Sequence, residues 1–302
     1  MHPILEARIP DGSRLEAVLA PIAPDGPAVS IRRFSKDRLT LAKLLQFGAL
    51  TEDAVGLLSV LVECKQNIVV AGGTGSGKTS LLNALSSLIP EAERVLVIED
   101  ARELQLQREH VVQLEARPPD AKGKGAVTIR DIFKASLRMR PDRIVLGEIR
   151  GCEALDLIQA MTSGHGGCLT TVHATYPSDT LNRLETLALM GGVDLPLHAL
   201  RTQLASAVDI VVQTARMRDG RRRVTHISEV LGTDDNYGYR ISDLFVCRAT
   251  RPLSDGSVPV EFLPTGALPG CMDIIQAHGL SIPPCMHAAA SRRTSESHAR
   301  NS

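Results

Sequence analysis

The stretch NIVVAGGTGSGKTS, residues 67–80, decides the fold. It starts as an apolar run rich in β-branched residues and ends in glycines followed by Lys78 and Thr79. The pattern Gly-x4-Gly-Lys-Thr between a strand and a helix is typical of a phosphate-binding loop. Glycines let successive backbone N–H groups point at phosphate oxygens, and the helix that follows adds the positive end of its dipole. The stretch therefore predicts a site for a nucleoside triphosphate.

Nine consecutive residues are expected to form this site. Lys78 would reach the β- and γ-phosphates, and Thr79 would ligate Mg²⁺. A nucleoside triphosphate and Mg²⁺ are accordingly the expected substrate and metal; the resemblance given below implies that the triphosphate is ATP. The nine residues are Gly72, Gly73, Thr74, Gly75, Ser76, Gly77, Lys78, Thr79 and Ser80.

The sequence around the loop predicts an α/β fold. Several apolar runs are nearly continuous, which is typical of strands buried on both faces. Helical patterns separate them, and one begins with a capping box formed by Thr128 and Asp131. Strands alternating with helices favour a mainly parallel sheet with flanking helices. The expected strands cover residues 67–71, 94–99, 111–116, 143–149, 168–173 and 209–214.

The chain is expected to contain five parts. The first holds short alternating strands and is too short to be an independent domain, so we interpret it as the remnant of an N-terminal α+β domain. The last is polar and is expected to be disordered. The parts are a truncated N-terminal domain (1–34), a linker with helices (35–66), an ATPase core (67–232), a C-terminal extension of short strands (233–288) and a tail (289–302).

Composition narrows the class of protein. The 34 basic and 34 acidic residues balance, which argues against binding nucleic acid through bulk charge, so no direct nucleic-acid partner is expected. Aromatic residues make up only 3%, which predicts an aliphatic core. No apolar run approaches the ~18 residues that span a bilayer. We therefore expect a cytoplasmic protein whose attachment to a membrane would come through a partner.

Acidic residues end two of the expected strands. Glu99 and Asp100 follow one apolar run, and Glu148 ends another. The carboxyl ends of parallel strands are where α/β sheets carry their ligand groups. A carboxylate there can orient or deprotonate the attacking water, or hold Mg²⁺ through a water molecule. We assign this role to Glu148 and a supporting catalytic role to Glu99.

Two histidines flank the strand expected at 168–173. A histidine at a strand end is commonly a packed or capping residue, but His173 or His165 could also donate a hydrogen bond near the γ-phosphate. His173 is favoured because it ends the buried run. No third ligand stands at metal spacing, so a zinc site is not predicted.

An arginine finger would complete a P-loop ATPase site. The adjacent pair Arg32 and Arg33 in SIRRF is favoured, because it lies between the N-terminal part and the linker. The basic run at 221–223 is interpreted as a solvated face. Other candidates are Arg138, Arg140 and Arg183.

The chain contains, in this order, the four segments GGTGSGKT, VIEDARELQL, LRMRPDRIVLGEIRG and GHGGCLTTVHA. Together they resemble the motifs of the secretion ATPase superfamily, which powers type II secretion, type IV pili and type IV secretion. The segments QLEARPPDAKGKGAVTIRD and EALDLIQAMTSGH look like its CpaF-like branch, the motors of tight-adherence (Flp) pili. The resemblance implies a RecA-like ATPase domain, a hexameric ring, an N-terminal domain whose arginines complete the ATP site, and docking on inner-membrane platform proteins. It also implies Glu148 as the Walker B base, Glu99 as the Asp-box acid and His173 as the His-box residue.

The sequence also departs from this branch. Gly166, Cys168 and Thr175 stand where the branch usually has an acid, Ser and Asn, which bears on positioning near the γ-phosphate. The long N-terminal region of the family is missing, so we expect a misassigned start, a truncated copy or a part supplied by partner chains. Three alternatives stay open: a type IV secretion or conjugation ATPase, a RecA-like DNA motor, and a nucleotide-binding remnant without motor activity.

Overall fold

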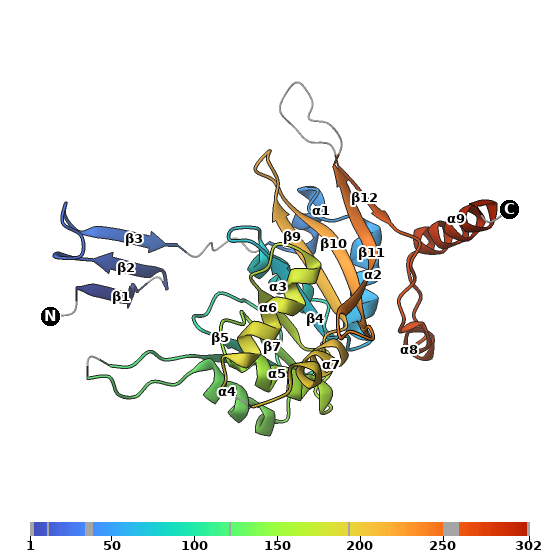
Figure 1. Cartoon of the computed structure of the whole chain (residues 1–302). Helices are drawn as coiled ribbons and strands as arrows, with labels where there is room; N and C mark the ends of the chain where they lie inside the picture. The colour runs from blue at the N-terminus through green and yellow to red at the C-terminus, as the bar shows by residue number, and fades with distance from the viewer. Residues whose placement is uncertain are drawn as a thin grey trace. The chain divides into compact units, whose positions relative to one another are not determined.

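The computed structural model describes residues 3–10, 12–33, 39–120, 122–192, 194–249 and 260–300. The chain divides into two compact units, Met1–Arg38 (unit 1) and Leu39–Ser302 (unit 2). The helices expected within 35–66 fall in unit 2, together with the part expected at 67–232. Figure 1 shows the elements of both units.

Unit 1 is a three-stranded antiparallel sheet in the order β1-β2-β3. Its strands are β1 (Ile4–Arg8), β2 (Arg14–Val18) and β3 (Ala28–Arg32). The alternation of apolar and polar residues predicted these strands correctly. Among its described residues the unit has no helix, so only the β part of the expected α+β remnant is present.

Unit 2 is built on one nine-stranded sheet. The strands β9, β4, β8, β7, β5 and β6 run parallel, and β10, β11 and β12 extend the sheet as antiparallel strands. In spatial order the strands are β12 (Val260–Pro264), β11 (Tyr239–Ala249), β10 (Arg222–Thr233), β9 (Ile210–Arg216), β4 (Ile68–Gly72), β8 (Leu169–Val172), β7 (Arg143–Leu146), β5 (Val95–Glu99) and β6 (Val111–Glu115).

Helices cover both faces of this sheet (Figure 1). Ile68 and Val70 of β4 pack into a core with α2 and α3, whereas Val69 and Ala71 pack into a second core with α4 to α7. Burial on both faces is the reason why β4 is apolar throughout. The helices are α1 (Leu41–Gln46), α2 (Glu52–Glu63), α3 (Lys78–Ser86), α4 (Ile129–Ser136), the short 3-10 helix η1 (Leu137–Met139), α5 (Glu153–Thr162), α6 (Pro177–Leu189), α7 (Leu197–Ala207), α8 (Met272–Ala277) and α9 (Pro284–Arg300).

Helices α2 and α4 begin at threonine caps, and the second of these is the predicted capping box. The Thr51 hydroxyl accepts a hydrogen bond from the Ala54 N–H at the start of α2. At the start of α4, Thr128 and Asp131 form the complete capping box. Each cap satisfies backbone N–H groups that lack a partner within the helix.

One expected part at the C-terminal end joins the main sheet, and another is corrected by the structure. The C-terminal extension expected at 233–288 adds β11 and β12 to the main sheet, because β10 runs through Thr233 and pairs with β11, a strand of 11 residues. The tail expected to be disordered at 289–302 is helical as far as Arg300. Pro284 fits the first turn of α9, and the alanines at 288–290 are the strongest helix formers, so the local sequence supports this helix despite its polarity.

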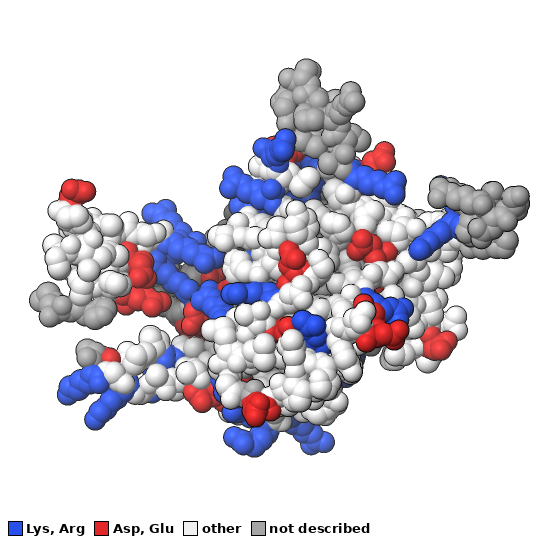
Figure 2. Space-filling view, viewed as in Figure 1, with Lys and Arg blue, Asp and Glu red and all other residues white. Residues whose placement is uncertain are grey.

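One face of unit 2 fits the balanced charge of the chain. On the face seen in Figure 2, acidic and basic side chains are interspersed. Across the described ranges, no helix combines the length and apolar character that crossing a bilayer requires.

Candidate active site

The phosphate-binding loop joins β4 to α3 at the carboxyl edge of the sheet. Gly75 and Gly77 have φ angles of +70° and +100°, which glycine adopts without strain. A Cβ added at Gly73 or Gly75 would meet no atom within 4 Å, and both residues are exposed. The outer side of the loop is therefore open, and α3 begins directly behind it. This cradle fits a phosphate chain.

The inner side of the loop is fixed by β9. The Ser76 and Thr214 hydroxyl oxygens lie 2.8 Å apart, and the Thr214 hydroxyl donates to the Ala71 carbonyl at 3.0 Å. A Cβ on Gly72 would stand 2.3 Å from Thr214 Oγ1, so only glycine fits there. Sequence reasoning missed Thr214, although it ends a strand expected at the same edge of the sheet.

Lys78 is buried beside the loop. Its ammonium donates to the carbonyls of Gly72 and Gly73, both at 3.0 Å, and lies 3.2 Å from His173 Nδ1. Burial lowers the pKa of Lys78, and the carboxylate of Glu148 opposes this shift. Lys78, the predicted phosphate-binding cation, thus contacts His173, the predicted hydrogen-bond donor near the γ-phosphate.

His173 links Lys78 to Glu148. His173 Nε2 lies 2.8 Å from Glu148 Oε1. Burial, followed by the charge of Lys78, lowers the pKa of His173, while Glu148 raises it. The lowered pKa favours the neutral ring of His173. In this form Nδ1 accepts from the Lys78 ammonium, and Nε2–H donates to the Glu148 carboxylate. Residues from α3 and from the ends of β7 and β8 therefore form one hydrogen-bonded chain.

Arg150 extends this chain and was not anticipated from the sequence. It donates to Glu148 Oε2 from Nε at 2.8 Å, and its Nη2 lies 2.7 Å from the same oxygen. Its Nη1 reaches Asp100 Oδ2 at 2.9 Å. Both oxygens of Glu148 are thus engaged, one by His173 and the other by Arg150.

Glu99 lies beneath the site rather than in this chain. Its side chain is buried, and Oε1 accepts hydrogen bonds from the backbone N–H groups of Glu103 and Leu104. Burial raises the pKa of Glu99 to about 7, against the opposing effect of these two donors. A Cβ on Gly147 would stand 3.0 Å from Glu99 Cγ. Glu99 therefore supports the backbone immediately before Glu148.

The strand directions separate the two histidines and place two of the candidate arginines at the other edge of the sheet. His173 follows β8, whereas His165 precedes it and so lies at the opposite edge of the parallel sheet. Arg138 and Arg140 likewise precede β7. Arg183 of α6 contributes to lowering the pKa of His173 and is the candidate on the side of the site.

The favoured finger residues belong to unit 1. Arg32 ends β3, Arg33 follows it, and both are exposed. Their assignment to an ATP site stays a prediction.

The basic run at 221–223 is not simply a solvated face. Arg223 is buried, and the Nε–H of Arg222 donates to the Gly75 carbonyl at 2.8 Å. A Cβ on Gly77 would stand 3.3 Å from Arg222 Cδ. The start of β10 therefore contacts the phosphate-binding loop, which the charge pattern alone did not indicate.

The donor set fits Mg²⁺. Thr79 is the second residue of α3, and its hydroxyl makes no side-chain hydrogen bond to the residues that the structure describes. A free hydroxyl and a nearby carboxylate are the oxygen ligands that Mg²⁺ prefers. Thr79 would hold the ion directly and Glu148 through water.

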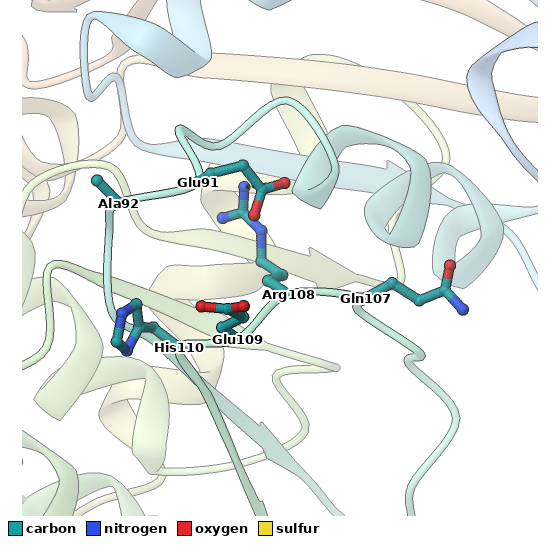
Figure 3. A pocket seen from close by; sticks show the side chains of 6 residues that line it. All are labelled: Glu91, Ala92, Gln107, Arg108, Glu109 and His110. Carbon is teal, nitrogen blue, oxygen red and sulfur yellow. Dashed lines mark ion pairs between the residues drawn. The ribbon is translucent and has the colours of Figure 1, made fainter.

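A hollow lies at the opposite edge of the sheet, before β5 and β6 (Figure 3). Within it the guanidinium of Arg108 is buried, donates to the Ile89 carbonyl and pairs with Glu91 at 3.6 Å. Arg108 thus pairs with an acidic residue of the same hollow, and the hollow lies at the end of the strands opposite to the phosphate-binding loop. The lining residues are Glu91, Ala92, Gln107, Arg108, Glu109 and His110.

Comparisons with known proteins agree with this geometry. The family model described as "Type II/IV secretion system protein" matches residues 1–237. A putative conjugal transfer protein of Mycobacterium tuberculosis is 40% identical over 250 residues, covering 83% of this chain and 69% of the relative. The type IV secretion system protein PtlH of Bordetella pertussis is 37% identical over 257 residues, covering 75% of this chain and 74% of PtlH.

Solved structures show the same fold. The crystal structure of the VirB11 ATPase from the Brucella suis type IV secretion system, in complex with sulphate, matches with a TM-score of 0.52 and 34% identity, covering 74% of this chain and 73% of that one. The pilus retraction motor PilT with bound ADP matches with a TM-score of 0.51 at 17% identity, covering 92% and 67% of the two chains, a likeness of fold alone. The α/β class with a RecA-like domain, predicted from the sequence, is confirmed.

Proposed function

The chain belongs to the type II/IV secretion system protein family, and we propose that it is a motor ATPase that hydrolyses ATP to ADP and phosphate. The membership confirms the resemblance to the secretion ATPase superfamily. The narrower assignment to the CpaF-like branch stays a prediction, as do the individual roles of the site residues.

One observation carries the proposal: the hydrogen-bonded chain from Lys78 through His173 to Glu148. A phosphate-binding cation, a neutral donor and a carboxylate meet at one edge of the sheet, behind an open glycine loop. P-loop hydrolysis needs a cation at the β- and γ-phosphates and a group that orients water for in-line attack. Lys78 supports the first need, and Glu148 the second.

The contacts also suggest how the site would start to act. Oε1 of Glu148 is engaged by His173, and Oε2 by Arg150. A γ-phosphate oxygen on the loop would offer His173 Nε2–H a second anionic acceptor, to which this donor could turn. Glu148 Oε1 would then be free to accept a proton from the attacking water. Bound Mg²⁺ would neutralise charge on the phosphates.

The proposed motor works as a homo-hexamer. Its unit 1 would move against unit 2, and Arg32 and Arg33 would complete the ATP site from the N-terminal side. Partner proteins of the inner membrane would hold the ring at a secretion or pilus platform, with the chain itself on the cytoplasmic side. The sequence resemblance to the CpaF-like branch supports Flp-type pilus assembly as the process that it drives.

A second candidate is a type IV secretion or conjugation ATPase. It is favoured by the relatives, which are described as a putative conjugal transfer protein and as a type IV secretion system protein. The chemistry would be the same and the cargo different. Neighbouring genes separate the two: a prepilin with platform genes supports the pilus, and mating-channel genes support conjugation.

Phosphate release from ATP with Mg²⁺, measured together with the mass of the particle in solution, tests the proposal. We expect turnover by a hexamer, and loss of nucleotide binding in Lys78→Ala. Binding without turnover by a monomer would favour the remnant without motor activity. Turnover that rises strongly with added DNA would favour the DNA motor.

A further inference from the structure

The hairpin between β9 and β10 rises beside the phosphate-binding loop. In the sheet register, Thr214 of β9 stands opposite Gly72, the last residue of β4. Arg216 lies two residues further along β9 and pairs with Arg222 of β10. The hairpin therefore continues past the end of β4, to the level of the loop, and brings two arginines there.

The Arg222 guanidinium is only partly used. Its Nε–H donates to the Gly75 carbonyl at 2.8 Å, and among the described residues this carbonyl is the one hydrogen-bond partner of the guanidinium. The two Nη groups make no hydrogen bond to those residues, and the side chain is exposed. Arg216, directly opposite in the register, is exposed as well. Like charges in directly opposed positions disfavour a β-ribbon unless an anion lies between them.

The strand order indicates which part of a bound nucleotide would lie beside the β9–β10 hairpin. His173 and Glu148 follow β8 and β7, which lie on one side of β4, whereas β9 and β10 lie on the other. The proposed hydrolytic groups mark the γ-phosphate end of the ligand. A triphosphate stretched over the loop therefore has its nucleoside end toward the β9–β10 hairpin.

From these observations we propose that Arg222 is a nucleotide-binding residue whose Nη groups donate to the phosphate nearest the nucleoside, the α-phosphate. The proposal rests on the ATPase function above and adds a contact from the antiparallel part of the sheet. Nε–H on the Gly75 carbonyl fixes the plane of the guanidinium, so its remaining donors are oriented before a ligand arrives. A planar fork of this kind suits phosphate oxygens better than a lysine ammonium would.

The test separates a phosphate contact from mere support of the loop. In Arg222→Gln the side-chain Nε2 is bonded to Cδ as Arg Nε is, so an N–H for Gly75 is kept while both Nη groups and the charge are lost. Arg222→Ala removes all of them. Arg221→Ala is the matched control, because Arg221 is the adjacent exposed arginine and its loss changes the net charge equally. The probe is a fluorescent N-methylanthraniloyl derivative of ADP, titrated with Mg²⁺ against the full chain.

We expect Arg222→Gln and Arg222→Ala each to weaken binding on the order of tenfold, as for a lost charge-assisted hydrogen bond, with Arg221→Ala unchanged. Wild-type affinity in Arg222→Gln would overturn the proposal, whether or not Arg222→Ala is weakened, because support of Gly75 would then suffice. An equal loss in Arg221→Ala would also overturn it in favour of a general charge effect. A wild-type chain that does not bind the probe would refute the ATPase function itself, a result distinct from the others. Melting temperatures check that the variants fold.

Discussion

Glu99→Gln should stabilise unit 2, and more strongly at alkaline pH. Burial raises the pKa of Glu99 from an ordinary value of 4.5 to about 7. The folded chain therefore keeps this proton at a pH where the unfolded chain has released it, and wild-type stability falls as pH rises from about 4.5 through 7. Glutamine has nearly the shape of a protonated glutamic acid and can still accept from the Glu103 and Leu104 N–H groups, so it avoids the cost of ionising a buried acid.

The expected size follows from the same shift. One pKa unit corresponds to about 1.4 kcal/mol, so raising the pKa of Glu99 from 4.5 to about 7 gives a gain of about 3 kcal/mol for Glu99→Gln at pH 8. At pH 5 the folded acid is protonated and the unfolded acid only partly ionised, so the gain falls to about 1 kcal/mol. For a unit of this size, 3 kcal/mol raises the melting temperature by roughly 6–12 °C. Asp209, whose pKa burial raises to about 6, affects both proteins equally and cancels.

Thermal unfolding of wild type and Glu99→Gln at pH 5 and pH 8 measures this difference. Glu109→Gln is the control, because Glu109 is exposed and its replacement should shift neither melting curve. If Glu99→Gln melts below wild type at pH 8, or if its gain is the same at both pH values, then Glu99 is ionised in the fold and the reasoning is wrong.

Two further substitutions test the support of the loop and of Glu148. Thr214→Val keeps the side-chain shape but removes the hydroxyl that contacts Ser76 Oγ and donates to the Ala71 carbonyl. We therefore expect a loss of about 1–3 kcal/mol in urea unfolding and weaker ADP binding; unchanged affinity would show that β9 does not fix the loop. Gly147→Ala would bring a methyl group to 3.0 Å from Glu99 Cγ, and two backbone N–H groups hold the Glu99 carboxyl group in place. We expect this substitution to lower the free energy of unfolding by about 1–3 kcal/mol. Gly73→Ala should leave it unchanged, because a methyl group at Gly73 has open space. Equal stability of the two alanine variants would count against tight packing at Gly147.

The sequence predicted the parallel strands and the loop because their signals are local. A strand that is buried on both faces must be apolar, and a loop that wraps a phosphate must be rich in glycine. Residues 67–80 show both patterns in one segment. Glu148 and His173 could be assigned to the loop's edge for a related reason: parallel strands end at the same edge, and each residue ends such a strand.

What the sequence could not predict depends on pairing between distant segments. Thr214 and Arg222 reach the loop only because β9 lies beside β4 and because β10 folds back along β9. The sequence alone does not specify which strands are neighbours in the sheet. Arg150 follows a predicted site residue, but its bridge to Asp100 needs β5 and β7 to be neighbours. The helix at 284–300 differs from the expected disorder because the helix-forming tendency of its alanines acts despite the polarity of the segment.

The central claim is that Glu148 activates water at a site that binds ATP independently of it. ATP affinity and single-turnover phosphate release, measured on Glu148→Gln and on wild type, test it most directly. The account predicts that Glu148→Gln binds ATP as wild type does but releases phosphate at least about a hundredfold more slowly, as expected for the loss of a general base. Phosphate release at the wild-type rate by Glu148→Gln would contradict it.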